Sequence, residues 1–245
     1  MYSIFVHIIV AMSMALYVCI ALIPYLFILL LPKSTRGHLM RYMTLGLGWT
    51  AVNIGMRPFV KVRYFDEAGN KDFSGIYVCN HRSASDAFLM SLLGKEAVQV
   101  VNGWPMRLPF FGFNARMSEY IDSTKIEVGD YPAVVRELIA KGVSVIAFPE
   151  GTRSESPLMN SFHSGIFHLA IELKVPVYPI CISGNEYFPD RKFRFHRSRA
   201  IFVKRLPPIM PEQYLAFPSA YVFKKRVHDI IQSESLNMDA IINKN

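Results

Sequence analysis

The feature that most constrains this chain is a long uncharged segment near its N-terminus. No Lys, Arg, Asp or Glu occurs between Ile4 and Leu31, and this run exceeds the roughly 20 helical residues that cross the hydrocarbon core of a bilayer. Pro24 is expected to kink this helix or to divide it. A cleaved signal peptide would be shorter and would begin with basic residues. The segment therefore predicts a helical membrane anchor.

Positive charge begins directly after this run, at Lys33, Arg36 and Arg41. Basic residues beside an apolar helix favour the cytoplasmic side of the membrane. We therefore predict a membrane protein whose remaining chain lies on the cytoplasmic face, with a bacterial inner membrane as the expected location. The segment 37–59 is mostly apolar with basic residues near its ends, so it predicts a second helix that packs on the first or lies in the interface.

Residues 60–245 are expected to form a single domain, with residues 1–59 as its anchoring helices. Short β-rich runs and helical segments alternate in this part of the chain. The predicted strands are 60–65, 75–80, 97–101, 143–148, 175–182 and 199–205, and the predicted helices are 86–93, 130–141, 164–174 and 218–234. Strands that are apolar almost throughout indicate a buried sheet. The predicted fold class is α/β, a mixed, partly parallel sheet flanked by helices, with an N-terminal helical membrane anchor and a fraying polar tail.

The formal net charge of +8 predicts an acidic partner. Much of the excess lies in residues 191–205, where Arg and Lys alternate with Phe193, Phe195 and Phe202. Such a segment can stack nucleic-acid bases, lie on phospholipid headgroups, or form a solvated strand without a partner. Because an apolar anchor precedes it, we favour a lipid surface and predict no nucleic-acid partner.

The first candidate for chemistry is "NHRSASD", residues 80–86. A strand is expected to end at Asn80 and a helix to begin near Ser85, so that His81 lies in the loop and Asp86 in the first helical turn. A carboxylate on one imidazole nitrogen fixes the tautomer and leaves the other nitrogen free to remove a proton from an attacking hydroxyl. The alternative is a helix cap with His81 as a surface loop residue.

The second candidate is "AFPEGTRSES", residues 147–156, which directly follows an apolar strand. Gly151 lets the backbone approach a ligand, Thr152 can donate a hydrogen bond, and Arg153 offers a bidentate fork, a combination that suits a phosphorylated substrate. Glu150 is expected to orient Arg153 or to accept a hydrogen bond from a substrate hydroxyl. The alternative is a turn with one surface ion pair.

Together these segments resemble the glycerolipid acyltransferase family, the lysophosphatidic acid and glycerol-phosphate acyltransferases. "NHRSASD" resembles the first family motif, histidine-four residues-aspartate (HX4D), and "FPEGTRS" resembles the third. Residues 108–123, with Pro109 and Gly112, resemble the second motif, and residues 175–182 resemble the fourth. All four occur in the family's order, so the resemblance covers roughly residues 60–185.

The resemblance implies a membrane-bound O-acyltransferase of phospholipid biosynthesis. Its acyl donor would be acyl-CoA or acyl carrier protein, and its acceptor the hydroxyl of a lysophospholipid, in the first place 1-acylglycerol 3-phosphate, which would give phosphatidic acid. The resemblance implies that His81, held by Asp86, is the general base and that no acyl-enzyme forms. It also implies an acceptor phosphate site made of Glu150, Gly151, Thr152 and Arg153. The expected partners are the membrane, the acceptor and the donor, with no cofactor besides that co-substrate.

Two positions depart from the family pattern. The second motif commonly ends in isoleucine-aspartate-arginine, but this chain has Ser123, and a lysine common before the fourth motif is replaced by His163. Both changes remove a cation from an expected phosphate site, where Arg116 or Lys125 would have to substitute. Two alternatives therefore stay open. One is an acyltransferase for a non-phosphatidate acceptor, such as an aminolipid, glycolipid or pigment intermediate, and the other is a non-catalytic lipid-binding protein.

Other motifs give no support to a different chemistry. The segment "GLGWTA", residues 46–51, matches a loose dinucleotide-binding pattern, but no strand precedes it. The chain contains no GxSxG nucleophile elbow of a serine esterase. His163 and His168 lack the i, i+4 spacing of a helical metal pair, and no cluster of acidic or thiol ligands accompanies them. We therefore predict no metal site.

Overall fold

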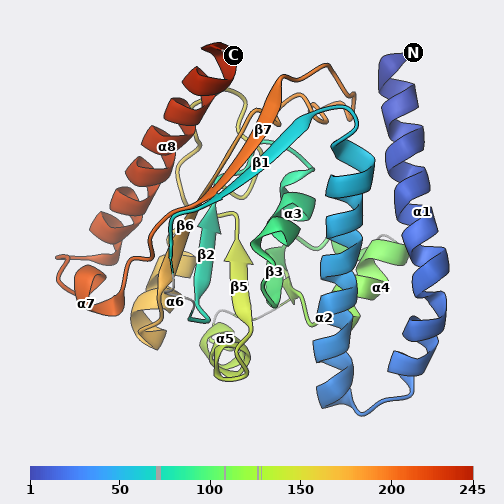
Figure 1. Ribbon diagram of the computed structural model, residues 1–245. Coiled ribbons are helices and arrows are strands. Elements are labelled where there is room, and N and C mark those ends of the chain that lie inside the picture. Colours follow the sequence, from blue (N-terminus) through green and yellow to red (C-terminus); the bar gives the residue numbers. More distant parts are fainter. Residues whose placement is uncertain (70–72, 108, 126, 128, 245) are drawn as a thin grey trace.

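The computed structural model describes residues 1–69, 73–107, 109–125, 127 and 129–244. Leu108, the first residue of the predicted second motif, lies outside them. The described residues form a seven-stranded sheet in the order β1-β7-β6-β2-β5-β3-β4 (Figure 1). The strands are β1 (Lys61–Asp66), β2 (Ile76–Cys79), β3 (Ala97–Val101), β4 (Ile121–Asp122), β5 (Ser144–Ala147), β6 (Val177–Ser183) and β7 (Ala200–Arg205).

The sheet is mixed, with a parallel part and a short antiparallel part. Strands β6, β2, β5, β3 and β4 run parallel to one another. Strand β7 is antiparallel to β6, and β1 is parallel to β7. The α/β fold class predicted from the sequence is therefore confirmed. Because parallel strands end at one edge of a sheet, the segments that follow β2, β5, β6 and β4 all begin at the same edge.

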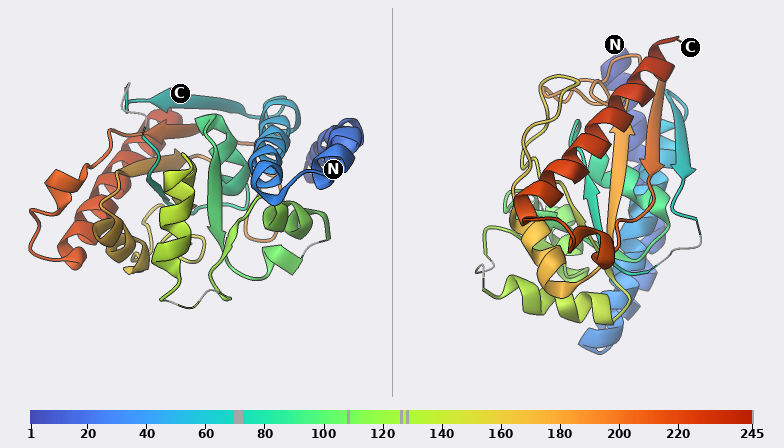
Figure 2. Two further views of the ribbon diagram at one scale, coloured as in Figure 1. Left: turned by 90° about the horizontal axis from the view of Figure 1, so that it is seen from below. Right: turned by 90° about the vertical axis from the view of Figure 1, so that its left-hand side faces the viewer.

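Helices cover both faces of the sheet (Figure 2). The helices that follow the N-terminal pair are α3 (Asp86–Leu89), η2 (Met90–Leu93), η3 (Pro105–Arg107), α4 (Pro109–Met117), α5 (Tyr131–Ala140), α6 (Gly165–Leu173), α7 (Pro211–Tyr214) and α8 (Ala220–Lys244). Side chains alternate between the faces along a strand. Ile76 and Val78 of β2 pack in one core with α5, α6 and α8. Tyr77 and Cys79 pack in a second core with α3 and η2.

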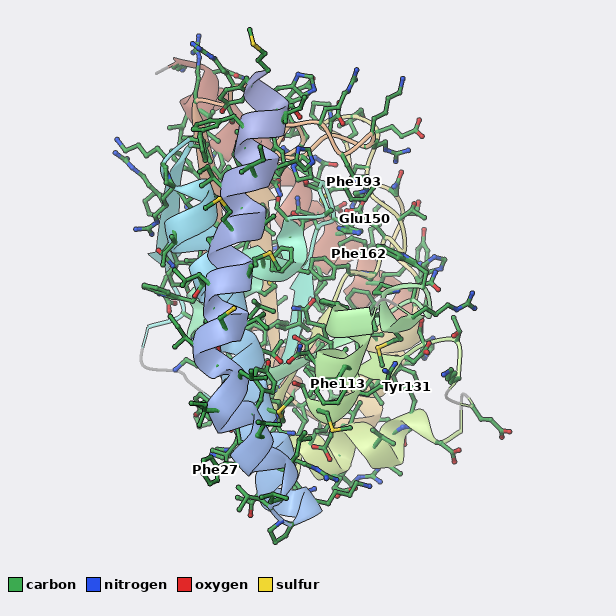
Figure 3. All side chains as sticks on the ribbon, turned by 90° about the vertical axis from the view of Figure 1, so that its right-hand side faces the viewer. Phe27, Phe113, Tyr131, Glu150, Phe162 and Phe193 are labelled. Carbon is green, nitrogen blue, oxygen red and sulfur yellow. The ribbon has the colours of Figure 1, made fainter. Side chains whose placement is uncertain are left out.

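The N-terminal segment folds as two antiparallel helices, α1 (Tyr2–Leu29) and α2 (Lys33–Thr50), and α2 continues into the π-helical turn η1 (Ala51–Met56). Pro24 lies inside α1 and does not divide it. Among the described residues, α1 is the one helix with the length and composition of a membrane-crossing helix. Apolar side chains along it are exposed, including Ile8, Leu16, Ile20, Ile23 and Phe27. Phe27 is 67% exposed, near the end of α1 that leads to α2 (Figure 3).

Helix α1 contacts the rest of the protein at both of its ends. Near its start, Val6 is buried in the second core, and Ser3 Oγ accepts a hydrogen bond from the Phe195 backbone N–H at 2.9 Å. Near its other end, the Tyr25 hydroxyl donates a hydrogen bond to Asn114 Oδ1 on α4. The helix therefore lies along the side of the domain instead of extending away from it, opposite α8 (Figure 1).

Helix α8 corrects the prediction for the C-terminal segment. The sequence predicted a helix that ends near residue 234 and a fraying tail, but α8 continues to Lys244. Met238 and Ile242 extend its buried side into the core against the sheet, while Asn237 faces solvent. The prediction was wrong because the segment is mostly polar, but its apolar residues Met238 and Ile242 are four positions apart and therefore lie on one face of a helix.

Strand β7 corrects the prediction for the basic segment. Residues 200–205 pair on both sides, with β1 and β6, and Phe202 and Arg205 are buried. They therefore do not form a lipid-facing strand. Only residues 191–199 are mostly exposed, in a loop that reaches the start of α1, where the Arg197 guanidinium lies 5.7 Å from the Tyr2 ring centroid.

Candidate active site

The predicted catalytic loop begins where β2 ends. Asn80 follows the strand and forms two hydrogen bonds with the backbone of Ile182 in β6, one from its Nδ2 to the carbonyl at 2.9 Å and one to its Oδ1 from the N–H at 2.8 Å. This side chain continues the pairing of the two strands for one more residue. His81 then lies in the loop and Asp86 is the first residue of α3, as the sequence predicted.

Asp86 is fully buried and accepts four hydrogen bonds. Its Oδ2 accepts one from His81 Nδ1 at 2.7 Å, and two from the backbone N–H groups of Arg82 at 2.7 Å and Ser83 at 2.9 Å. Its Oδ1 accepts one from the Asn185 amide at 2.5 Å. Because Nδ1 of the imidazole donates to this carboxylate, Nε2 carries the free lone pair. The His81 side chain is 25% exposed, so Nε2 belongs to a ring that a substrate can reach.

Glu150 holds the main chain of the histidine. It is buried, and its Oε1 accepts a hydrogen bond from the His81 backbone N–H at 2.8 Å. Its Oε2 accepts from the Ser154 hydroxyl at 2.7 Å and from the Asn160 backbone N–H at 2.8 Å. Ser154 in turn donates its backbone N–H to the His81 carbonyl at 2.8 Å. The segment after β5 therefore binds both the backbone N–H and the carbonyl of His81. The sequence did not reveal this role of Glu150.

Gly151 and Thr152 are exposed in the turn that follows. Gly151 has a φ of +72°, in the left-handed region that favours glycine. A Cβ at this position would lie 3.1 Å from His163 Nε2, so the imidazole packs closely against the turn. The backbone N–H of His163 donates to the Pro149 carbonyl at 2.8 Å, which holds it there. The histidine that replaces a common family lysine thus lies beside the predicted phosphate site.

Arg153 is half-buried and faces the loop after β6. Its guanidinium lies 5.4 Å from the ring centroid of Phe193 and donates long hydrogen bonds to two neutral acceptors, the carbonyls of Asp190 at 3.4 Å and Arg191 at 3.5 Å. In the part of the chain that the structure describes, no carboxylate lies within ion-pair distance of this guanidinium. Among these residues, no acid neutralises the charge of Arg153.

Ser123 lies away from the histidine, and Arg116 bonds to a segment outside the loop of His81. Ser123 follows β4, and β5 and β3 lie between β4 and β2, which separates the two strand ends by about 14 Å. The Ser123 hydroxyl donates to the Val101 carbonyl at 3.1 Å, and Arg116 donates to the Met106 carbonyl at 2.6 Å. The structure therefore brings His81, Asp86 and the 150–154 segment together, places Ser123 farther along the same edge, and engages Arg116 with the Met106 carbonyl instead of this site.

The site also contains residues that the sequence did not single out. Asn185 bonds to Asp86, and Ser154 and Asn160 bond to Glu150. A polar residue just after an apolar parallel strand was a usable signal for Asn185, because such strands end at the binding edge of an α/β sheet. No sequence pattern marks the other two. Among the described residues, no group of three His, Cys, Asp or Glu side chains is arranged to hold a metal ion.

Comparisons with known proteins match the part of the chain that contains these residues. A family model described as Acyltransferase matches residues 62–183, which contain all four motifs. A 1-acyl-sn-glycerol-3-phosphate acyltransferase of Cocos nucifera is 31% identical over 146 residues, which are 57% of this chain and 47% of that protein. The alpha form of the Homo sapiens enzyme is 31% identical over 142 residues, 56% of this chain and 50% of that protein. The chain spans about half the length of the curated relatives it matches.

A solved structure extends the likeness to nearly the whole fold. The crystal structure of the 1-acyl-sn-glycerophosphate (LPA) acyltransferase PlsC from Thermotoga maritima superimposes with a TM-score of 0.67, covering 92% of this chain and 94% of that one at 23% identity. This likeness shows a shared fold, and the sequence comparisons confirm the family resemblance predicted from the motifs. The chain belongs to the glycerolipid acyltransferase family.

Proposed function

We propose that this protein transfers a fatty acyl group to the free hydroxyl of a lysophospholipid, with 1-acylglycerol 3-phosphate as the acceptor and phosphatidic acid as the product. The observation that carries the proposal is the 2.7 Å hydrogen bond between His81 Nδ1 and the buried carboxylate of Asp86. This bond orients a general base whose Nε2 is free. The curated relatives bear the name of the same reaction.

The chemistry follows from that geometry. Nε2 of His81 removes the proton of the acceptor hydroxyl as its oxygen attacks the thioester carbonyl of acyl-CoA or of an acylated carrier protein. The new C–O bond forms while the C–S bond breaks, and the leaving thiolate takes up the proton that the imidazolium carries. Asp86 stabilises the positive imidazolium during the transfer. Glu150 keeps the histidine in place through its backbone.

The acceptor phosphate is assigned to the exposed turn next to Glu150. Gly151 and Thr152 offer exposed backbone and a hydroxyl, and Arg153 supplies a cation without an acidic partner among the described residues. An arginine binds phosphate oxygens through charge-assisted hydrogen bonds. Glu150 is an anion whose oxygens already accept three hydrogen bonds, so it supports this site without contacting the phosphate.

We further propose that α1 lies in one leaflet of the membrane, with the domain on its cytoplasmic face, as in a bacterial inner membrane. Both ends of α1 contact the domain, so a docked α1 cannot cross a bilayer without drawing the domain into it. Its exposed apolar side chains would enter the acyl region, and the basic loop 191–199 at its start would lie at the headgroups. A lipid acceptor then reaches the site from the membrane itself.

The test is to offer purified protein a panel of acceptors with one long-chain acyl-CoA and to identify the products by mass spectrometry. The panel contains 1-acylglycerol 3-phosphate, other lysophospholipids and monoacylglycerol. We expect phosphatidic acid from the first acceptor and none with His81→Ala. If only a different acceptor is acylated, that acceptor is the substrate in place of 1-acylglycerol 3-phosphate. If no acylated product forms, the alternative of a non-catalytic lipid-binding protein is favoured.

A further inference from the structure

The side chain of Arg82 ties the catalytic loop to the end of the C-terminal helix. Arg82 directly follows the proposed base, and its side chain is only 3% exposed. Its Nη1 donates to Asp239 Oδ1 at 2.7 Å and its Nη2 donates to Asp239 Oδ2 at 2.8 Å, which is a bidentate pair. Asp239 lies in the last two turns of α8, whose C-terminal end reaches the end of the molecule toward which β2 and β5 point (Figure 1).

The same guanidinium joins two further segments of the site. Its Nη2 donates to the Pro157 carbonyl at 3.3 Å, in the segment after the 150–154 turn. Its Nη1 lies 3.6 Å from the Glu186 carboxylate, and Glu186 follows Asn185, which bonds to Asp86. Burial alone would lower the pKa of Arg82, but its hydrogen bond with Asp239 and the nearby acidic charges raise that pKa above its usual value. The cation is therefore matched by acids in a buried position.

The main chain of Arg82 belongs to the catalytic hydrogen bonds. Its N–H donates to Asp86 Oδ2 at 2.7 Å, and this is the oxygen that accepts from His81 Nδ1. A shift of the Arg82 side chain would therefore move the backbone next to the base. Removal of one partner of a buried ion pair leaves an uncompensated charge, which its surroundings relieve by rearranging.

We propose that Asp239 is a positioning residue that acts through Arg82, so that the last turns of α8 set the alignment of His81 on Asp86. Helix α8 lies outside residues 62–183, which the family model covers. The inference rests on the proposed acyl transfer for its kinetic test. Its structural part, the dependence of the loop on Asp239, stands independently of the reaction.

The kinetic test compares Asp239→Asn with a matched control on the same helix. Glu234 also forms an ion pair from α8, since its carboxylate lies 2.7 Å from Lys204 Nζ. Within the described part of the chain, no hydrogen bond or ion pair joins Glu234 to residues 80–86. We expect Asp239→Asn to lower kcat by about 10- to 100-fold, because small displacements of catalytic groups have effects of that size. KM for the acceptor should change less than about twofold. Asp239→Glu should restore part of kcat, and Glu234→Gln should leave it unchanged.

The structural test is hydrogen–deuterium exchange of the peptide that covers residues 80–86, at a temperature well below the Tm of every variant. We expect faster exchange of its backbone amides in Asp239→Asn than in wild type, and no such change in Glu234→Gln. Arg82→Gln should have the same two effects, and the double variant Arg82→Gln with Asp239→Asn should be no worse than the more damaging single change.

The outcomes separate this inference from the proposed function. If wild type transfers no acyl group, the proposed function fails, and exchange at residues 80–86 still decides whether Asp239 holds the loop. If wild type is active and Asp239→Asn matches Glu234→Gln in both kcat and exchange, the inference is overturned. Equal loss of kcat in these two variants, with equal loss of Tm, would also overturn it, because the effect would then be general destabilisation.

Discussion

The substitution Asp86→Asn isolates the charge behind the proposed base. Oδ2 of Asp86 accepts three N–H bonds and Oδ1 accepts one from Asn185. The oxygen of the new amide can keep the three bonds if its NH2 group faces the Asn185 amide. Asn185 can then turn its own amide by 180° and accept, because its Oδ1 has no hydrogen-bond partner among the described residues. Its Nδ2 then loses the 3.1 Å bond to Ser85 Oγ, whose hydroxyl can donate to the turned Oδ1 instead. The change therefore preserves the bond to His81 and removes the negative charge.

The size of the effect follows from burial. Asp86 is fully buried, and two unit charges about 4 Å apart interact by about 4 kcal/mol at the effective dielectric constant of about 20 that suits protein sites. The imidazolium is only partly formed in the transition state, so the charge is expected to contribute about 2–4 kcal/mol. Asp86→Asn should then lower kcat/KM by roughly 30- to 900-fold. Removal of the base itself by His81→Ala should cost about 10²–10⁴-fold.

The assay is the initial rate of phosphatidic acid formation from 1-acylglycerol 3-phosphate and acyl-CoA, with thermal unfolding as the control for folding. Because Asp86 acts through His81, the double variant His81→Ala with Asp86→Asn should be no slower than His81→Ala alone. A folded Asp86→Asn protein within about threefold of wild type would refute the reasoning. The reasoning would also be refuted if the double variant were slower than His81→Ala by the full factor that Asp86→Asn costs on its own.

Three further predictions concern Glu150, the phosphate turn and the exposed apolar face of α1. Glu150→Ala should lower the free energy of unfolding by about 2–4 kcal/mol, because it leaves buried N–H donors without acceptors, and it should lower kcat more than it raises KM for the acceptor. A rise in KM without a loss of kcat would instead indicate that Glu150 contacts the acceptor phosphate. Arg153→Ala should raise KM for the phosphorylated acceptor by about 10- to 100-fold through the loss of charge-assisted hydrogen bonds, whereas Ser123→Arg should leave that KM unchanged, because Ser123 lies two strands away from the turn after β5. With monoacylglycerol as the acceptor, Arg153→Ala should have no such effect, and an Arg153→Ala protein with an unchanged KM for the phosphorylated acceptor would show that the phosphate binds elsewhere. Replacement of the exposed Ile20 and Phe27 by Glu should lower the partition coefficient of the protein onto vesicles by more than tenfold without a change in Tm. Burial of each apolar side chain in the membrane contributes about 1.5–3 kcal/mol to the free energy of binding. Unchanged sedimentation with vesicles would show that this face does not enter the membrane.

Features that depend on short stretches of chain could be predicted before the structure was known. The uncharged run after Ile4 predicted helix α1, and the alternating apolar strands and helices predicted the α/β sheet. The end of an apolar strand at Asn80 and the start of a helix near Ser85 predicted that His81 lies in a loop before Asp86, and the structure joins the two side chains at 2.7 Å. Local periodicity and the ends of elements suffice for such features, because the interacting groups lie within one turn or one loop.

The contacts by which distant segments complete the site depend on the tertiary structure. Glu150 reaches the backbone of His81 across 69 positions of sequence, and Asn185 reaches Asp86 across 99. The ion pair of Arg82 and Asp239 spans 157 positions, on a helix end that the sequence predicted to fray. These contacts arise from the order of the strands and from the packing of α8 on β6. A local pattern can single out one residue of such a pair, but it does not say which distant group the fold places against that residue.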